Sequence, residues 1–214
     1  MATKGVFRVE CHHCGEGFDA DFWTVVRGDR DADVKELILS GEFDILMCPK
    51  CETMFQHEEP FLYMDPSRDL LAFVMPEAYL EKKEEWLARM KTDYEPLRAS
   101  ISSGQRLTGE PLYFFGLGPL TALLEDDRDR EEETEVLEFM AREAGLNLLP
   151  VKPASARELD IPFSIPMPAG LGGRAAALNS ASSLREKNDA LPRLKKLVDH
   201  LSALKGEDLP FLKR

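Results

Sequence analysis

The four cysteines of the chain occur as two Cys-x-x-Cys pairs, and this arrangement limits the folds that the chain can adopt. The pairs are Cys11 with Cys14 and Cys48 with Cys51. This is the ligand spacing of zinc sites that use four thiolates. Because four thiolates complete the tetrahedral shell of zinc and leave no position for an activated water, we expect one structural zinc ion.

The two pairs lie in a repeated sequence frame. Segment 9–18 aligns with segment 46–55, and each places its cysteine pair between an apolar residue and a phenylalanine, Phe18 or Phe55. We interpret the repeat as two knuckles, in each of which a strand enters a tight turn that carries two thiolates and a second strand returns. Two facing knuckles would surround one ion, and the binding energy of the metal would contribute to folding.

Disulfide bonds and redox-active thiols are the alternative roles of the cysteines. Disulfides require an oxidising compartment, and residues 1–5 do not resemble a secretion signal, so we expect a cytoplasmic protein. Redox-active pairs usually open a helix, whereas both pairs here follow and precede predicted strands. His12 and His13 lie between the first two cysteines, where side chains of a knuckle point away from the metal. We expect surface imidazoles there, with metal ligation as the alternative.

A folded segment is expected between the two knuckles. Cys14 and Cys48 are separated by 33 residues, where zinc ribbons usually have about 15 to 20. Asp31 can cap a short helix over 32–39, and the following Ser-Gly at 40–41 can end it. The long connection is therefore predicted to be structured.

The segments around the second pair resemble a known family. Apolar runs at 60–65 and 70–75 flank a Pro-Ser-Arg-Asp turn and predict a β-hairpin. With segment 34–43 and the Cys-Pro-Lys-Cys motif at 48–51, they resemble the CpXC domain, a zinc-ribbon family with two Cys-Pro-x-Cys motifs. The resemblance covers roughly residues 5–76. It implies a zinc ribbon but no particular reaction, and His12 departs from it by replacing the proline of the first motif.

The charge balance disfavours nucleic acid as a partner. The chain has 27 Lys and Arg against 39 Asp and Glu, a net charge of −12, and residues 1–76 alone have 7 against 15. A zinc ribbon that binds nucleic acid needs clustered Lys and Arg to neutralise phosphates. No run of 18 apolar residues occurs, so we expect no membrane span.

The pattern after Pro76 is helical rather than alternating. Apolar and aromatic residues at three- and four-residue steps predict an amphipathic helix, followed by a loop at 100–109 and a strand at 111–115. The residues of this stripe are Tyr79, Trp86, Met90, Tyr94 and Leu97.

A second helix is expected from about residue 119, with a break at the acidic run 125–133. We interpret this run as a solvated loop and the acid-rich first turn of a further helix. A strand at 146–151 would complete a small α/β unit over residues 77–161.

The C-terminal part predicts a linker and a helix. Residues 162–183 are rich in Pro, Gly, Ala and Ser and predict a flexible linker. Residues 170–175 match a G-x-G-x-x-A dinucleotide pattern, but the prolines before it disfavour the strand that the motif requires. Segment 184–214 predicts an amphipathic helix with near-heptad leucines, which docks on its own domain, on a second copy or on a protein partner.

The predicted fold class is therefore α+β: a zinc-ribbon-like antiparallel sheet with a helical insertion over 1–76, a small α/β unit and a C-terminal amphipathic helix. No catalytic motif stands out, so we expect an interaction or regulatory module that binds a protein partner or a second copy through the C-terminal helix. The alternative is an enzyme with a site within 108–165. A deep polar pocket there would favour the enzyme, and an exposed apolar patch beside the ribbon would favour the module.

Overall fold

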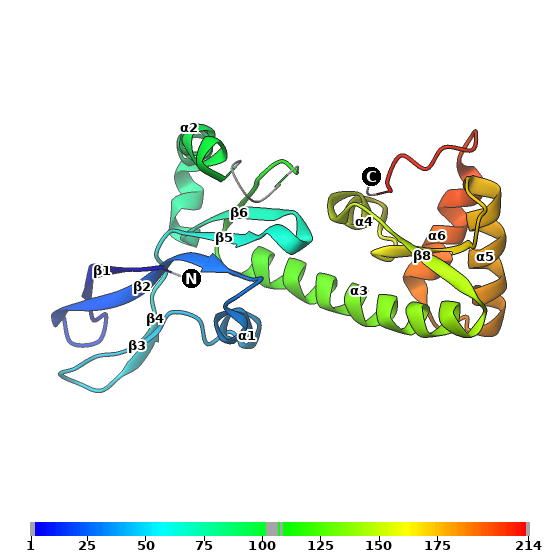
Figure 1. Cartoon of the computed structure of the whole chain (residues 1–214). Helices are drawn as coiled ribbons and strands as arrows, with labels where there is room; N and C mark the ends of the chain where they lie inside the picture. Colours follow the sequence, from blue (N-terminus) through cyan, green and yellow to red (C-terminus); the bar gives the residue numbers. More distant parts are fainter. Residues whose placement is uncertain (1–2, 102–106, 108, 213–214) are drawn as a thin grey trace. The chain divides into compact units, whose positions relative to one another are not determined.

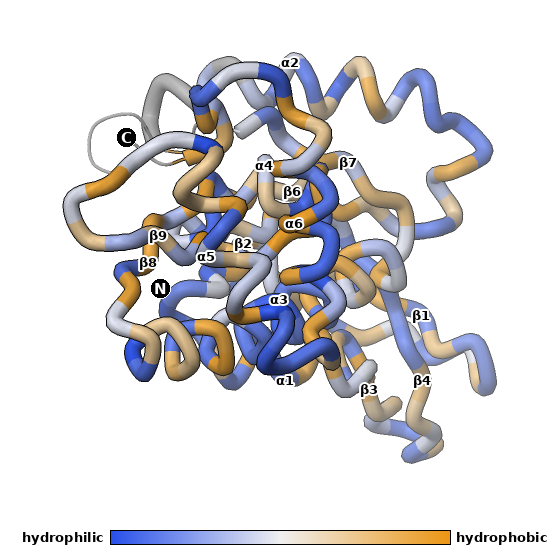
Figure 2. The backbone as a smooth tube through the Cα atoms, turned by 90° about the vertical axis from the view of Figure 1, so that its right-hand side faces the viewer, coloured by the Kyte–Doolittle hydropathy of each residue, from blue (hydrophilic) through white to orange (hydrophobic). Residues whose placement is uncertain are grey.

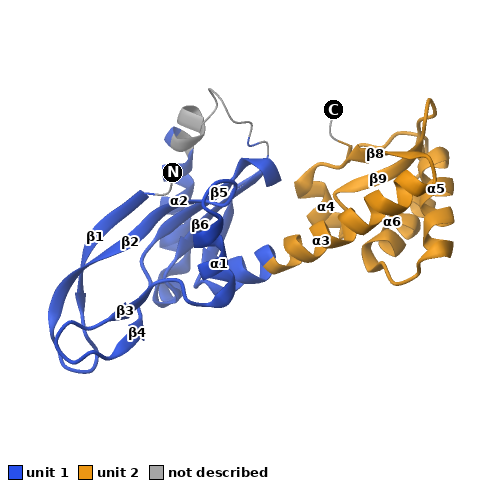
Figure 3. Ribbon diagram, turned by 60° about the horizontal axis from the view of Figure 1, so that its bottom comes forward, with its two compact units in different colours: residues 1–124 blue, residues 125–214 orange. Residues whose placement is uncertain are grey.

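The computed structural model describes residues 3–101, 107 and 109–212, without the side chains of residues 95 and 97–101. It divides into two compact units, Met1–Leu124 and Glu125–Arg214 (Figure 3). Most of the loop predicted at 100–109 lies outside the described residues. Among the helices that the structure describes, none is both long and apolar enough to cross a membrane.

A five-stranded mixed sheet forms the centre of the first unit, in the order β1-β2-β5-β6-β7 (Figure 1). Its strands are β1 (Thr3–Glu10), β2 (Gly17–Arg27), β5 (Phe61–Asp65), β6 (Leu70–Met75) and β7 (Leu112–Phe115). The antiparallel pairing that we expected holds for β1–β2 and β5–β6, but the sheet is mixed, because β2 pairs with β5 and β6 with β7 in parallel. Each parallel pair is joined by a connection that contains a whole helix, which is long enough to return the chain to the same end of the sheet.

Helices cover both faces of this sheet. On one face, α1 (Ala32–Ser40) and the first turns of α3 (Gly118–Glu143) bury Ile38 and Leu120 against Val26 and Tyr63. On the other face, η2 (Glu77–Lys82) precedes α2 (Lys83–Ile101), whose Met90 is fully buried. The helix predicted after Pro76 is thus confirmed.

Local sequence signals account for the short elements of the first unit. Gly41 ends α1 with φ 74°, as predicted, but the carboxylate of Asp31 accepts a hydrogen bond from Arg27 N (3.1 Å) and does not cap the helix. The predicted hairpin is present as β5 and β6, joined by η1 (Pro66–Arg68). Its turn is held by Asp65, whose Oδ1 accepts hydrogen bonds from Ser67 N (3.0 Å) and Arg68 N (3.2 Å).

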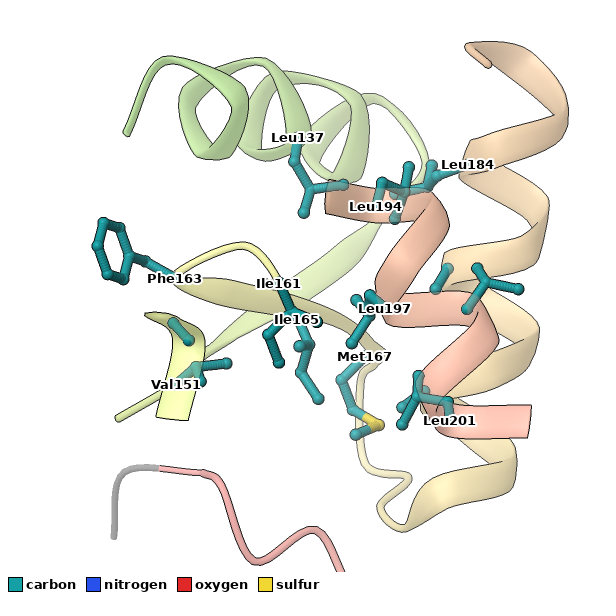
Figure 4. Packing of buried hydrophobic residues seen from close by; sticks show 14 of the residues in the cluster. Leu137, Val151, Ile161, Phe163, Ile165, Met167, Leu184, Leu194, Leu197 and Leu201 are labelled. Carbon is teal, nitrogen blue, oxygen red and sulfur yellow. The ribbon is translucent and has the colours of Figure 1, made fainter. Parts of the chain in front are cut away.

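The second unit packs helices against a two-stranded antiparallel sheet. Its elements after α3 are β8 (Leu146–Pro150), α4 (Pro153–Leu159), β9 (Ser164–Pro168), α5 (Arg174–Lys187) and α6 (Pro192–Ala203). Figure 4 shows leucines of α6 meeting apolar side chains of β9, α3 and α5; the fully buried members include Leu137, Ile165, Leu184, Leu194, Leu197 and Leu201. Hydrophobic and hydrophilic residues alternate along α6 (Figure 2), and its apolar stripe is covered by its own unit.

Residues 162–183 do not form the flexible linker that their composition predicted, because they contain β9 and most of α5. Pro166 and Pro168 lie opposite Leu148 and Leu146 in the antiparallel pair with β8. Among the described strands, β9 has a partner on one side only. Prolines at alternate positions can leave their missing N–H groups on the unpaired side, so the pairing with β8 survives.

The other predicted boundaries also differ from the structure. Strands 112–115 and 146–150 belong to different units, so residues 77–161 do not form one α/β unit. The C-terminal segment 184–214 contains the end of α5 and the whole of α6 rather than one helix. A turn at 188–191 separates the two helices, and Pro192 opens α6 at a position where its missing N–H is not needed.

The acidic run 125–133 lies inside the continuous helix α3, so the break and the solvated loop that we expected are wrong. Asp127, Arg130 and Glu133 recur at three-residue steps and are between 1% and 6% exposed. Burial is tolerated because carboxylates and guanidinium groups meet in one network. Its ion pairs are Arg130 with Asp126, Asp127 and Asp160, Arg157 with Asp127, and Arg193 with Asp126, Glu133 and Asp160.

Candidate metal centre

Two hairpins of the first unit carry the four cysteines. The first knuckle joins β1 to β2 after the pair Glu10↔Gly17. The second joins β3 (Ile45–Met47) to β4 (Met54–Gln56) after the pair Met47↔Met54. These pairs occupy equivalent positions in the repeated sequence frame, so the predicted duplication extends to the strand register.

The two turns have the same backbone hydrogen bonds. In the first, Cys11 N donates to Glu16 O and Gly15 N donates to Cys11 O, both at 2.8 Å. In the second, Cys48 N donates to Thr53 O and Glu52 N to Cys48 O, both at 3.0 Å. The residue after each second cysteine has a positive φ, 70° at Gly15 and 58° at Glu52. A glycine adopts this conformation without strain, whereas the second knuckle holds a glutamate there.

The turns bring the four sulfur atoms together, all within 4.8 Å of one another. Cys11 Sγ lies 3.7 Å from Cys51 Sγ, and Cys14 Sγ lies 3.7 Å from Cys48 Sγ, so each short contact joins the two knuckles. Cys11 and Cys48 are buried, whereas Cys14 and Cys51 are accessible, and all four are free of disulfide bonds. The four cysteines predicted as ligands thus form a cluster that could hold a metal ion.

Aromatic side chains of the two knuckles contact each other. The rings of Phe18 and Phe55, the phenylalanines of the repeated frame, meet edge to face with centroids 6.3 Å apart. His12 is exposed and its ring lies 5.6 Å from that of Phe55. His13 is exposed as well, and neither imidazole belongs to the sulfur cluster. The expected surface positions of His12 and His13 are therefore confirmed.

The thiols of the cluster differ in acidity. The hydroxyl and backbone amide of Thr53 lower the pKa of Cys51 to about 6. A backbone hydrogen bond from Glu16 acts in the same direction on Cys14, but desolvation and the three neighbouring thiols outweigh it and raise the pKa of Cys14 to about 12. Without a cation, four crowded sulfurs resist full ionisation, and a bound metal ion would relieve that repulsion.

A salt bridge also links the two turns. Lys50 Nζ of the second knuckle lies 2.9 Å from Glu16 Oε2 of the first. The hydrogen bond to Glu16 and the attraction of its carboxylate raise the pKa of Lys50. Both groups are exposed, so water and salt screen this pair and it contributes little to stability.

The dinucleotide pattern at 170–175 lies between a strand and a helix, as that motif requires, although the sequence did not predict the strand. The strand β9 precedes it and α5 follows it. However, β9 pairs antiparallel with β8, and the first N–H groups of α5 bind the chain itself. Arg174 N donates to Glu207 O (3.0 Å) and Ala175 N donates to Glu207 Oε2 (3.1 Å). The chain's own carboxylate thus occupies the place where a pyrophosphate would bind.

Comparison with known families agrees with the geometry of the knuckles. Residues 9–110 match the model of a family described as CpXC protein. No curated protein matches the chain, and no solved structure does. The match begins at residue 9 instead of the predicted 5, continues past residue 76 and includes both knuckles, α1 and the β5–β6 hairpin. Residues 9–110 are therefore a CpXC protein domain.

Proposed function

We propose that the CpXC domain binds one structural zinc ion through Cys11, Cys14, Cys48 and Cys51. A zinc–sulfur distance of about 2.3 Å gives a tetrahedron with edges of about 3.8 Å. The two 3.7 Å contacts between the knuckles are close to this edge. Four sulfur donors select a soft or borderline metal such as zinc, and four protein ligands leave no open position for catalysis at the metal.

We propose further that the protein is an interaction or regulatory module of the cytoplasm, where thiolates stay reduced. The observation that carries this proposal is an exposed apolar face on the second knuckle, where Met47 is 62% and Met54 67% exposed. The leucines of α6 are buried in their own unit, so we assign partner binding to the first unit instead of the C-terminal helix. The enzyme alternative loses support because the segment 108–165 is divided between the two units.

Metal analysis of matched variants tests the zinc proposal. We expect one zinc ion per chain in protein purified without added metal, measured by native mass spectrometry. Cys48→Ser should release the ion because three thiolates cannot close the shell, whereas His12→Ala should retain it. Retention of zinc by Cys48→Ser, or its loss from His12→Ala, would show that the ligand set is wrong.

A further inference from the structure

The outer face of the β3–β4 hairpin is apolar and accessible. Met47 and Met54 lie directly opposite each other, and Ile45 lies two residues before Met47, so the three side chains share one face. They are 62%, 67% and 39% exposed, respectively. The other face carries Leu46 and Phe55, which are half-buried, and the Phe55 ring contacts Phe18 of the first knuckle. The hairpin therefore has one face that packs inside its unit and one apolar face that does not.

The first knuckle shows that this fold does not require apolar residues on the outer face. Its inner pair, Val9↔Phe18, is apolar like the inner pair Leu46↔Phe55. Its outer pair is Glu10↔Gly17, at the positions that Met47 and Met54 occupy in the second knuckle. The same turn and register form with a polar residue and a glycine there. The turn and register thus do not require the methionine pair, and a contiguous exposed apolar face is a candidate contact surface for a partner.

The charges around the hairpin indicate the chemistry of that partner. Segment 42–59 has one Lys, Lys50, and one His, His57, which already face Glu16 and Glu59, respectively. The same segment has four glutamates, Glu42, Glu52, Glu58 and Glu59, besides Asp44, which is half-buried in a small pocket. A second copy of this face, a nucleic acid or an anionic membrane would bring further negative charge against this rim. A protein segment with Lys or Arg beside apolar side chains complements both the rim and the apolar centre.

We propose that Ile45, Met47 and Met54 form a docking face for a basic, apolar protein segment. This inference rests on the proposed function of the domain as an interaction module. Methionine suits the role because its flexible, polarisable side chain adapts to aliphatic and aromatic partners. The carboxylates of segment 42–59 attract the basic residues of the partner, and the methionines supply the contact area.

Peptide binding to the full-length, zinc-loaded chain tests this proposal. The probes are synthetic fluorescent peptides with the same Leu and Phe anchors, flanked either by Lys or by Glu, and binding is read by fluorescence anisotropy. We expect the Lys-flanked peptide to bind at least about tenfold more tightly than the Glu-flanked one, and the difference to shrink in high salt. The double variant Met47→Gln/Met54→Gln should weaken binding about tenfold or more.

Val6→Gln is the matched control, because Val6 is a 69% exposed strand residue on β1 and the substitution should leave binding unchanged. Unaltered peptide binding by the double variant, or equal binding of both peptides, overturns the docking face. Two further results would overturn the proposal: dimerisation that depends on concentration, or binding to anionic phosphatidylglycerol vesicles, if the double variant abolishes it. The face would then bind a second copy of the chain or a membrane. Zinc content is measured in every sample. A metal-free wild-type chain would contradict the proposed zinc-binding function. Zinc-loaded double variants with normal peptide binding would contradict the docking face alone.

Discussion

Asp44 lies where the chain leaves α1 for the second knuckle, with a left-handed backbone at φ 57°. Its carboxylate is half-buried in a small pocket that Glu58 and Glu59 also line. Desolvation, followed by repulsion from Glu59 and Glu58, raises the pKa of Asp44 to about 7. An ionised Asp44 is therefore unfavourable in the folded protein.

The raised pKa makes part of the stability of the first unit depend on pH. The folded state holds a proton on Asp44 that the unfolded chain loses near its ordinary pKa of 3.8, so this residue lowers the stability as pH rises from about 4 to about 7. We expect Asp44→Asn to stabilise the protein at pH 8 by on the order of 1 kcal/mol and to have little effect at pH 4. Asparagine also tolerates the left-handed backbone.

Urea unfolding of Asp44→Asn at both pH values measures this effect. Glu36→Gln is the control for the loss of one negative charge, because Glu36 is exposed on α1. An equal gain at pH 4 and pH 8 would contradict the assigned pKa.

The clustering of the four cysteines could be predicted from the sequence, because metal ligands need fixed spacing within each knuckle. It does not predict the burial of Asp127, Arg130 and Glu133, since a run of charges is usually solvated. One signal was present: Asp126 and Asp127 stand four and three residues before Arg130, the spacing of ion pairs on one helix. The burial of Asp127, Arg130 and Glu133 depends on ion-pair partners that are distant in the sequence, namely Arg157, Asp160 and Arg193.

The network in which Arg130 lies joins three elements of the second unit. Arg130 of α3 donates hydrogen bonds to Asp126, Asp127, Asp160 and the backbone oxygen of Ile161. Asp160 follows α4 and also pairs with Lys196 of α6. A single buried guanidinium thus binds three carboxylates and a backbone carbonyl, and it shares the carboxylates with Arg157, Arg193 and Lys196.

Arg130→Met should destabilise the second unit by about 3 to 5 kcal/mol, because it removes the most buried cation of the network and leaves the buried Asp127 with Arg157 as its remaining ion-pair partner. Arg142→Met is the matched control on the same helix. Arg142 pairs with Glu138 at the surface, where both side chains are more than half exposed, so its loss should change stability by less than about 1 kcal/mol. Thermal unfolding followed by circular dichroism compares the two variants, and equal shifts would show that the network does not stabilise the unit.

At the scale of elements, the hairpin β5–β6 and the helices α1 and α2 were predictable because turn residues and periodic apolar positions are local signals. The parallel pairs β2–β5 and β6–β7 were not, because they join strands that are distant in the sequence. For β9, proline composition favoured a linker over a strand. An edge position removes that conflict, but only tertiary structure reveals the edge.

For the whole molecule, the division into two units determines what removal of the metal should do. All four cysteines and both tryptophans, Trp23 and Trp86, lie in the first unit. The second unit has a hydrophobic core of its own, formed around α5, α6 and β9. The proposed zinc ion would therefore stabilise the first unit and have little effect on the second.

We expect a strong chelator to destabilise the first unit selectively, by on the order of several kcal/mol, because the metal contributes folding energy to the knuckles. Hydrogen exchange followed by mass spectrometry should show loss of protection in β1, β3 and β4 with protection retained in α5 and α6. Tryptophan fluorescence gives an independent signal, since it reports on the first unit alone. Cys48→Ser should reproduce the chelated pattern in the presence of zinc. Simultaneous loss of protection in α5 and α6 would show instead that the two units unfold together.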